Sequence, residues 1–132
     1  MLHRDDAVAL IRNLYEARVR GDKAAVAAYW ADNAHFEIAG HQSRAGDLSL
    51  KAWNAMDAIE PLIDRFTFSD LEALETVVEG GKVMVVWRVT VTTEGKPPVS
   101  TRLCDLFTLG DDGKITSLIQ FVDTALMRDL VG

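Results

Sequence analysis

This chain of 132 residues has little of what several classes of protein need. Cys104 is the one cysteine, which excludes an internal disulfide and a cysteine-rich zinc site, so we expect a reducing, cytoplasmic setting. Lys and Arg number 14 against 20 Asp and Glu, for a net charge of -6, so we expect no binding to nucleic acid or to an anionic membrane. Arg12 and several acids interrupt the apolar residues near the N-terminus, and this pattern predicts neither a signal peptide nor a transmembrane span.

The motifs of common metal, nucleophile and cofactor sites are also missing. His3, His35 and His41 lack the HxH or HxxxH spacing of metal ligands, so we predict no metal. No serine has a GxSxG context, and no Walker or Rossmann glycine pattern occurs. The sequence therefore favours a protein that works without a cofactor.

What the sequence does have is the composition of one packed domain, which we expect to span residues 1–132. Hydrophobic residues make up 48% of the chain and charged residues 26%, as a globular core requires. Apolar residues at helical spacing predict three helices, from Asp5 or Asp6 to Gly21, over Lys23–Trp30, and from Ser49 or Leu50 to Phe66. Pro61 lies inside the third, where we expect a kink or a break near Ile59 or Glu60. A strand over His35–Ile38 precedes that helix.

The second half of the chain changes character at Thr67. Four β-rich segments follow, separated by glycine-containing stretches at residues 80–81, 94–98 and 110–113. Strands joined by such short loops form an antiparallel meander, and helices packed on one of its faces complete an α+β domain.

Strand alternation then predicts which side chains face the core. Alternate residues from Val83 to Val91 are apolar, so this set is expected to point inward. By the same alternation, Asp105 shares the inward face with Phe107. Gln120 is a second inward polar residue, on the next strand.

Asp105 is the residue that most needs an explanation, because an ionised carboxylate in an apolar interior costs several kcal/mol unless it is paired. In a structural interpretation it accepts hydrogen bonds from Gln120, Tyr15 or a buried water. In a functional interpretation burial raises its pKa, and the neutral acid donates a hydrogen bond to an oxyanion. The residue pattern leaves both interpretations open.

Three segments in order, YEARVRGDKAAVAAYWADNAHFEI, CDLFTL and DDGKITSLIQFVD, resemble the nuclear transport factor 2-like superfamily, most closely its SnoaL-like and ketosteroid isomerase-like members. The resemblance runs from about Asp6 to Met127. It implies a cone-shaped, barrel-like fold, in which a curved and mainly antiparallel sheet carries the three helices of the N-terminal half on its concave face. Isomerases, cyclases, dehydratases, epoxide hydrolases and non-catalytic binding domains share this fold.

The resemblance also implies roles for single residues. In ketosteroid isomerase, an acid kept neutral by an apolar site helps to form the oxyanion hole, and Asp105 matches its position. The tyrosine of the first helix falls on Leu14 or Tyr15, and Tyr15 is either that hydroxyl or a plain core residue. Ile38 stands where the isomerases have their aspartate base. His41 is either a substitute base at the pocket mouth or a solvated loop histidine.

Limonene epoxide hydrolase is a further relative that the resemblance suggests. That enzyme needs two carboxylates and an arginine, whereas Gln120 and Thr90 stand at the matching carboxylate positions here. Epoxide hydrolysis of that kind is therefore not expected.

Side chains between the helices and the sheet are candidates to line a cavity for a small, mostly apolar molecule that carries a carbonyl or hydroxyl group. With Gln120, the candidates are Phe36, Ile38, Trp53, Met56, Trp87, Phe107 and Leu118. The opposite face of the sheet is apolar as well, and with the resemblance it suggests a homodimer through Met84, Val86, Leu106, Ile119 and Phe121.

Two classes of function remain open at this stage. One is a cofactor-independent isomerase, cyclase or dehydratase, in which Asp105 acts as acid or oxyanion stabiliser with Tyr15, Gln120 and His41. The other is a non-catalytic ligand-binding or dimerisation domain, in which Asp105 is structural.

Overall fold

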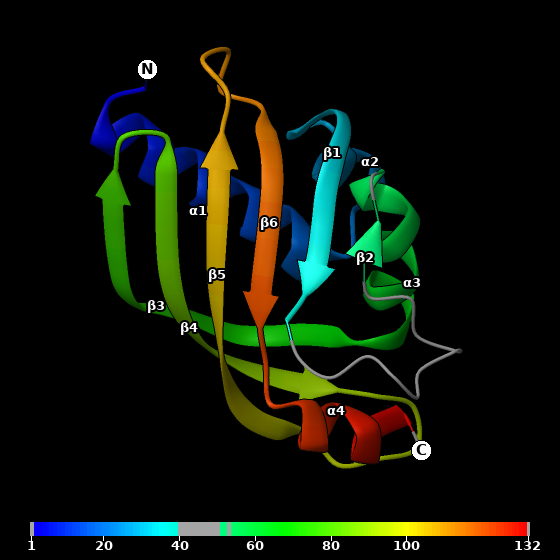
Figure 1. Cartoon of the computed structure of the whole chain (residues 1–132). Coiled ribbons are helices and arrows are strands. Elements are labelled where there is room, and N and C mark those ends of the chain that lie inside the picture. Colours follow the sequence, from blue (N-terminus) through cyan, green and yellow to red (C-terminus); the bar gives the residue numbers. More distant parts are fainter. Residues whose placement is uncertain (1, 40–50, 53, 132) are drawn as a thin grey trace.

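A strongly curved sheet organises the fold, with α1 crossing behind it and the shorter helices gathered at one end (Figure 1). The computed structural model describes residues 2–39, 51–52 and 54–131. The strands are β1 (Trp30–Ile38), β2 (Lys51–Ala52), β3 (Thr67–Glu79), β4 (Lys82–Thr92), β5 (Val99–Leu109) and β6 (Ile115–Phe121). The helices are α1 (Arg4–Arg20), α2 (Lys23–Ala27), α3 (Ala55–Arg65) and α4 (Thr124–Val131).

The described strands form one sheet in the order β2-β1-β6-β5-β4-β3. The run β3 to β6 is the expected antiparallel meander, while β1 pairs with β6 in parallel. The α+β class and the mainly antiparallel sheet are therefore confirmed. The sheet is mixed because β1 and β6, which are far apart in the chain and joined by no hairpin, pair in parallel.

Alternation along β4 sets the core as predicted. Its inward residues, from Val83 to Val91, are all buried, and they meet the apolar stripe of α1 that contains Ile11 and Leu14. Burial of such a side chain stabilises the fold by roughly 1.5–3 kcal/mol.

Register shifts bend the sheet, and two of the four among the described strands contain a residue with a positive φ angle. The pairing register shifts between Trp30 and His35 in β1, and between Ser69 and Glu72 in β3. Asn33 and Asp70 lie in these shifts with positive φ angles of 57° and 50°. Short polar side chains tolerate this left-handed conformation, and an extra residue on one strand increases local twist and bends it. Figure 1 shows the result, since β3 sweeps beneath the sheet before it turns upward.

The second helix and the first strand have boundaries different from those predicted. Helix α2 ends at Ala27 rather than at Trp30, and β1 begins at Trp30 rather than at His35. Trp30 pairs with Ile115, and the amide of Ile115 donates to the carbonyl of Tyr29 at 2.9 Å. Pairing with β6 therefore overrides the helical pattern of KAAVAAYW.

The third helix begins later than predicted, and of the predicted kink or break at its proline the break does not occur. Ser49 and Leu50 lie outside the described residues, but Lys51–Ala52 form strand β2, and α3 begins at Ala55. It then continues through Pro61 to Arg65. Pro61 removes only the hydrogen bond to the carbonyl of Asp57, and both residues are exposed, so water can hydrate that carbonyl.

Helix α4 was not predicted. Asp123 caps it by accepting from the amide of Leu126 at 3.0 Å. Leu126 and Leu130 turn inward from this helix, which closes the wide end of the curved sheet.

Candidate functional site

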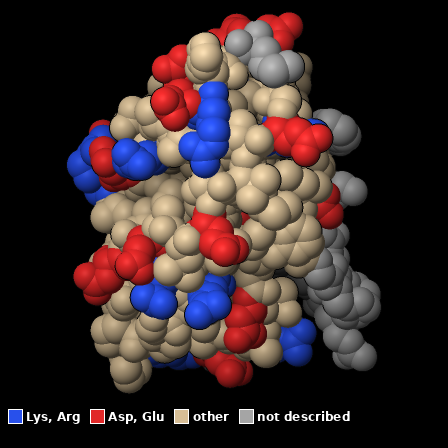
Figure 2. Space-filling view, turned by 90° about the vertical axis from the view of Figure 1, so that its left-hand side faces the viewer, with Lys and Arg blue, Asp and Glu red and all other residues tan. Residues whose placement is uncertain are grey.

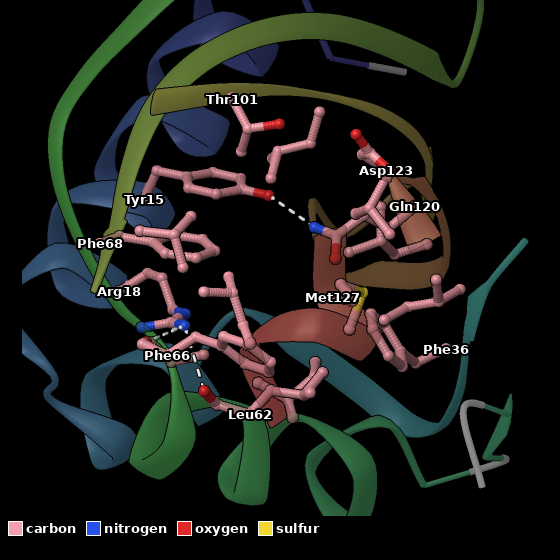
Figure 3. A pocket seen from close by; sticks show the side chains of 18 of the residues that line it. Tyr15, Arg18, Phe36, Leu62, Phe66, Phe68, Thr101, Gln120, Asp123 and Met127 are labelled. Carbon is pink, nitrogen blue, oxygen red and sulfur yellow. Dashed lines mark hydrogen bonds between the residues drawn. The ribbon is translucent and has the colours of Figure 1, made fainter. Parts of the chain in front are cut away.

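A cavity of about 90 Å³ lies inside the wide end of the curved sheet, with room for on the order of six water molecules. Residues from helices α1, α3 and α4 and from the strand ends close around it (Figure 3). The described residues on its wall are Leu14, Tyr15, Arg18, Val26, Trp30, Phe36, Ile38, Ile59, Leu62, Phe66, Phe68, Val91, Thr101, Leu103, Leu118, Gln120, Val122, Asp123, Leu126, Met127 and Leu130. An apolar wall with a few polar groups is the usual form of a small-molecule site.

Asp105 lies directly behind this cavity and is 0% exposed. Three donors hold its carboxylate: the hydroxyl of Tyr15, the indole Nε1 of Trp87 at 3.0 Å from Oδ2, and the amide Nε2 of Gln120 at 3.0 Å from Oδ1. Gln120 is its direct cross-strand partner on β6. The hydrogen-bond partners that the structural interpretation named, Gln120 and Tyr15, are both present, and Trp87 is a third.

Burial raises the pKa of Asp105 to about 6, because desolvation penalises the carboxylate. The three hydrogen bonds act in the opposite direction and lower that pKa. Burial likewise raises the pKa of the Tyr15 hydroxyl well above its usual value, and the nearby carboxylate adds to that shift. Near neutral pH, Asp105 is therefore the member of this pair whose charge changes, while Tyr15 stays neutral.

Packing on α1 fixes the position of Tyr15. Its ring stacks on Trp87 with a centroid distance of 4.4 Å and meets the Phe107 ring edge-on at 6.5 Å. Aromatic contacts of this kind leave the ring one well-defined orientation. The hydroxyl is thus held between the Asp105 carboxylate and the cavity, where Figure 3 shows it pointing toward Gln120.

The amide of Gln120 has a defined direction for the same reason. Its Nε2 donates both to Asp105 and, at 3.3 Å, to the oxygen of Tyr15. No described residue donates to its Oε1, which Figure 3 shows pointing away from Tyr15 into the cavity. The ionised Asp105 accepts from Nε2 and so fixes the orientation of the amide. In this state Oε1 of Gln120 is a hydrogen-bond acceptor on the cavity wall.

Arg18 is a wall residue that the sequence analysis missed. It is 8% exposed, its Nη2 donates to the carbonyls of Phe66 at 2.6 Å and Leu62 at 3.3 Å, and its guanidinium lies 3.9 Å from the centroid of the Phe68 ring. Burial lowers its pKa to about 10, so it remains a cation at neutral pH. Its spacing of three residues from Tyr15 on a helix, which places both side chains on one face, was the available signal.

The candidate residues from the sequence divide into three groups. Tyr15, Gln120, Phe36, Ile38 and Leu118 line the cavity. Asp105, Trp87, Phe107 and Met56 are not among the described lining residues: the first three are buried behind Tyr15, and Met56 packs against the core. Alternation along a strand predicts which face of the sheet a side chain lies on. It does not predict whether helix α1 separates that side chain from the cavity. His41 and Trp53 lie outside the described residues.

Other kinds of site have little support in the described part of the chain. No group of three or more His, Cys, Asp or Glu residues there is arranged to hold a metal ion. No described helix is both long and apolar enough to span a membrane. On the side of the molecule shown in Figure 2, basic side chains are interspersed with acidic ones instead of forming a continuous patch.

Comparison with known proteins identifies the family. The family model described as the SnoaL-like domain matches residues 11–118, which include Tyr15 and Arg18 on α1 and the strand of Asp105, and which end before Gln120 and α4. The chain belongs to this SnoaL-like family. No curated protein matches the chain in a sequence search.

Solved structures show how widely this SnoaL-like fold occurs. A proposed isomerase from Bacillus subtilis superposes with a TM-score of 0.80 at 16% identity, covering 100% of this chain and 96% of its own. A nuclear transport factor 2-like protein of unknown function from Burkholderia pseudomallei gives 0.77 at 18% identity, covering 96% and 97%. A proposed polyketide cyclase from Xanthomonas campestris gives 0.69 at 21% identity, covering 98% of each chain. At these identities the likeness establishes the fold alone.

Proposed function

We propose that this SnoaL-like protein binds a small, mostly apolar molecule in its cavity, with a carbonyl or hydroxyl oxygen of that molecule placed against Tyr15. A hydroxyl group of the ligand could also donate to Oε1 of Gln120. The observation that carries the proposal is the position of the Tyr15 hydroxyl, between the buried Asp105 and the cavity. A wall that is apolar except for this pair and a few further polar groups would select such a ligand.

The same arrangement supports acid catalysis without a cofactor, of the isomerase or cyclase type. When Asp105 is protonated, its O–H can donate to the oxygen of Tyr15, and the Tyr15 O–H is then free to donate to a ligand oxygen that gains negative charge. If a full proton is transferred, it passes from Tyr15 to the ligand while Asp105 replaces it, which leaves Asp105 as the carboxylate. Asp105 thus acts through Tyr15 and does not itself touch the ligand.

Proteins of this fold with related descriptions support an enzyme of this class. The Bacillus subtilis protein is described as a proposed isomerase and the Xanthomonas campestris protein as a proposed polyketide cyclase. Those descriptions belong to distant relatives, so the argument for this chain depends on its own residues.

A non-catalytic binding protein is the second candidate, and one observation favours it. Asp123 is the only carboxylate among the described residues of the wall, and it is exposed and caps α4. A general base for removing a proton from a ligand carbon is therefore not apparent among those residues.

Binding and turnover of a small β,γ-enone test both candidates together. Calorimetry with 3-cyclohexenone and with phenol would measure binding, and conversion of 3-cyclohexenone to the conjugated 2-cyclohexenone would be followed by ultraviolet absorbance. We expect binding in the wild type. Because the described wall supplies no base, water must take the proton from C2 of the enone, so turnover should be slow; it should be lost in Tyr15→Phe and kept in Tyr29→Phe, which alters a half-buried tyrosine outside the described wall. Binding without turnover would favour the non-catalytic candidate, and the absence of binding would contradict the proposed function.

A further inference from the structure

A cation without an anionic partner lies on the wall of the cavity. The Arg18 side chain is 8% exposed, yet no carboxylate of the described residues forms an ion pair with it. Asp105, the one buried acid among the described residues, is already held by Tyr15, Trp87 and Gln120. A buried charge is stable when it is paired, so an unpaired one at a cavity points to a missing anion.

The contacts that Arg18 does make use only part of its guanidinium. Nη2 donates to the carbonyls of Leu62 and Phe66 at the C-terminal end of α3, where carbonyl groups carry partial negative charge. The Phe68 ring covers one face of the guanidinium. A guanidinium has five N–H groups, and those on Nε and Nη1 have no acceptor among the described residues.

We propose that Arg18 binds the acidic group of the ligand, and that the natural ligand is accordingly a small carboxylic acid with an apolar body. This inference rests on the proposed function only in assuming that the cavity holds a ligand. The planar fork of a guanidinium matches a carboxylate, while the rest of the wall is apolar enough to hold a ring or a short acyl chain.

The positions of the polar groups refine this ligand class. Tyr15 and Arg18 are three residues apart on α1 and both line the cavity, so one ligand can face both side chains. In Figure 3, Tyr15, Phe68 and Arg18 follow one another along one side of the cavity. A keto or hydroxy acid, with its second oxygen a few bonds from the carboxylate, would reach both groups.

A purely structural role for Arg18 is the competing explanation. Capping the two carbonyls at the end of α3 favours a cation but uses only Nη2, and it leaves Nε and Nη1 without an acceptor among the described residues. Burial still lowers the pKa of Arg18 to about 10, so these contacts do not fully offset the desolvation of the cation. An anionic ligand that accepts hydrogen bonds from Nε and Nη1 would stabilise this buried cation.

Matched ligands of equal shape test the inference on the wild-type protein. Cyclohexanecarboxylate and cyclohexanecarboxamide differ in charge but hardly in size, and calorimetry at pH 7 would compare their dissociation constants. We expect the carboxylate to bind at least tenfold more tightly than the amide. Equal or tighter binding of the amide would overturn the inference, and this comparison needs no variant that could fail to fold.

Variants on α1 then assign the preference to one residue. Arg18→Gln should bring the tenfold ratio close to one, and Arg18→Lys should keep part of it, whereas Arg20→Gln removes the same charge from an exposed position and should leave the ratio unchanged. A ratio that persists in a folded Arg18→Gln would also overturn the inference. If cyclohexanone and the amide bind while the carboxylate does not, only the inference fails; if none of the three binds, the proposed function fails with it.

Discussion

Tyr15 on α1 donates its hydroxyl hydrogen to the carboxylate of Asp105 on β5, which lies 90 positions further along the chain. This contact joins the helical layer to the sheet at the back of the cavity. It also links Asp105, whose charge changes with pH, to the hydroxyl of Tyr15, which lines the cavity. The properties of the site should therefore depend on the protonation state of Asp105.

Stability should fall with rising pH because of Asp105. Its pKa is raised from 3.8 to about 6, so the folded state holds a proton that the unfolded chain has already released. The stabilisation is complete below about pH 4 and is lost as pH rises to about 6, and it amounts to on the order of 3 kcal/mol. Urea unfolding at several pH values should show this decline in the wild type relative to Asp105→Asn. Parallel curves for the two proteins would contradict it.

Removing the Tyr15 hydroxyl should move that titration upward. The hydrogen bond from Tyr15 favours the ionised form of Asp105 and lowers its pKa. In Tyr15→Phe we expect the pKa of Asp105 to rise above about 6, and the unfolding free energy at neutral pH to fall by about 1–3 kcal/mol. Carbon-13 NMR of the carboxyl group would measure the pKa. Tyr29→Phe is the control, and an equal shift there would argue against a specific effect of Tyr15.

The sequence predicted the fold well where paired strands are also neighbours in the chain. Alternation identified the buried face of β4 and placed Asp105 inward, because each strand of the meander lies beside its neighbour in sequence. It predicted the boundary between α2 and β1 wrongly, since Trp30 is determined by its parallel partner Ile115 rather than by its neighbours. Helix α4 was missed because its capping residue, Asp123, directly follows a strand and was assigned to that strand.

The candidate site was predictable only in part. Tyr15 and Gln120 could be proposed from face and family resemblance, and both line the cavity. Helical spacing from Tyr15 could have placed Arg18 on the same face of α1, but not its contacts, because the carbonyls of Leu62 and Phe66 that it caps depend on how α3 ends. Trp87 and Phe107 lie behind Tyr15, which only the packing of α1 on the sheet determines.

Replacing Pro61 with alanine should stabilise the protein. The proline lies inside α3 and is exposed, so it costs a helix hydrogen bond without contributing to the core. In Pro61→Ala the new amide can donate to the carbonyl of Asp57, and we expect a gain of about 1–3 kcal/mol in unfolding free energy. Pro97→Ala, in the exposed turn between β4 and β5, should instead lose up to about 1 kcal/mol through added freedom of the unfolded chain. Urea denaturation of the two variants would separate these effects, and a destabilised Pro61→Ala would contradict the expectation.

The outer face of the sheet carries an apolar row that crosses four strands. Val77 pairs with Met84, Met84 with Leu106, and Leu106 with Ile119, so these side chains share one face. Val77 is 60% exposed and Met84 39%, and Phe121, at 46%, lies next to the row. Apolar side chains gathered in this way usually meet a partner.

We propose that this partner is a second copy of the chain, paired face to face about a two-fold axis. Light scattering after gel filtration should then give twice the monomer mass for the wild type at micromolar concentration. Met84→Glu should give the monomer, because the two-fold axis brings like charges together in a dry interface. Val19→Glu is the matched control, since Val19 is 37% exposed on α1, away from the row, and should leave the dimer intact. A monomeric wild type, or a dimer that survives Met84→Glu and Phe121→Glu, would place the subunit contact elsewhere or remove it, and the apolar row would then need a different partner.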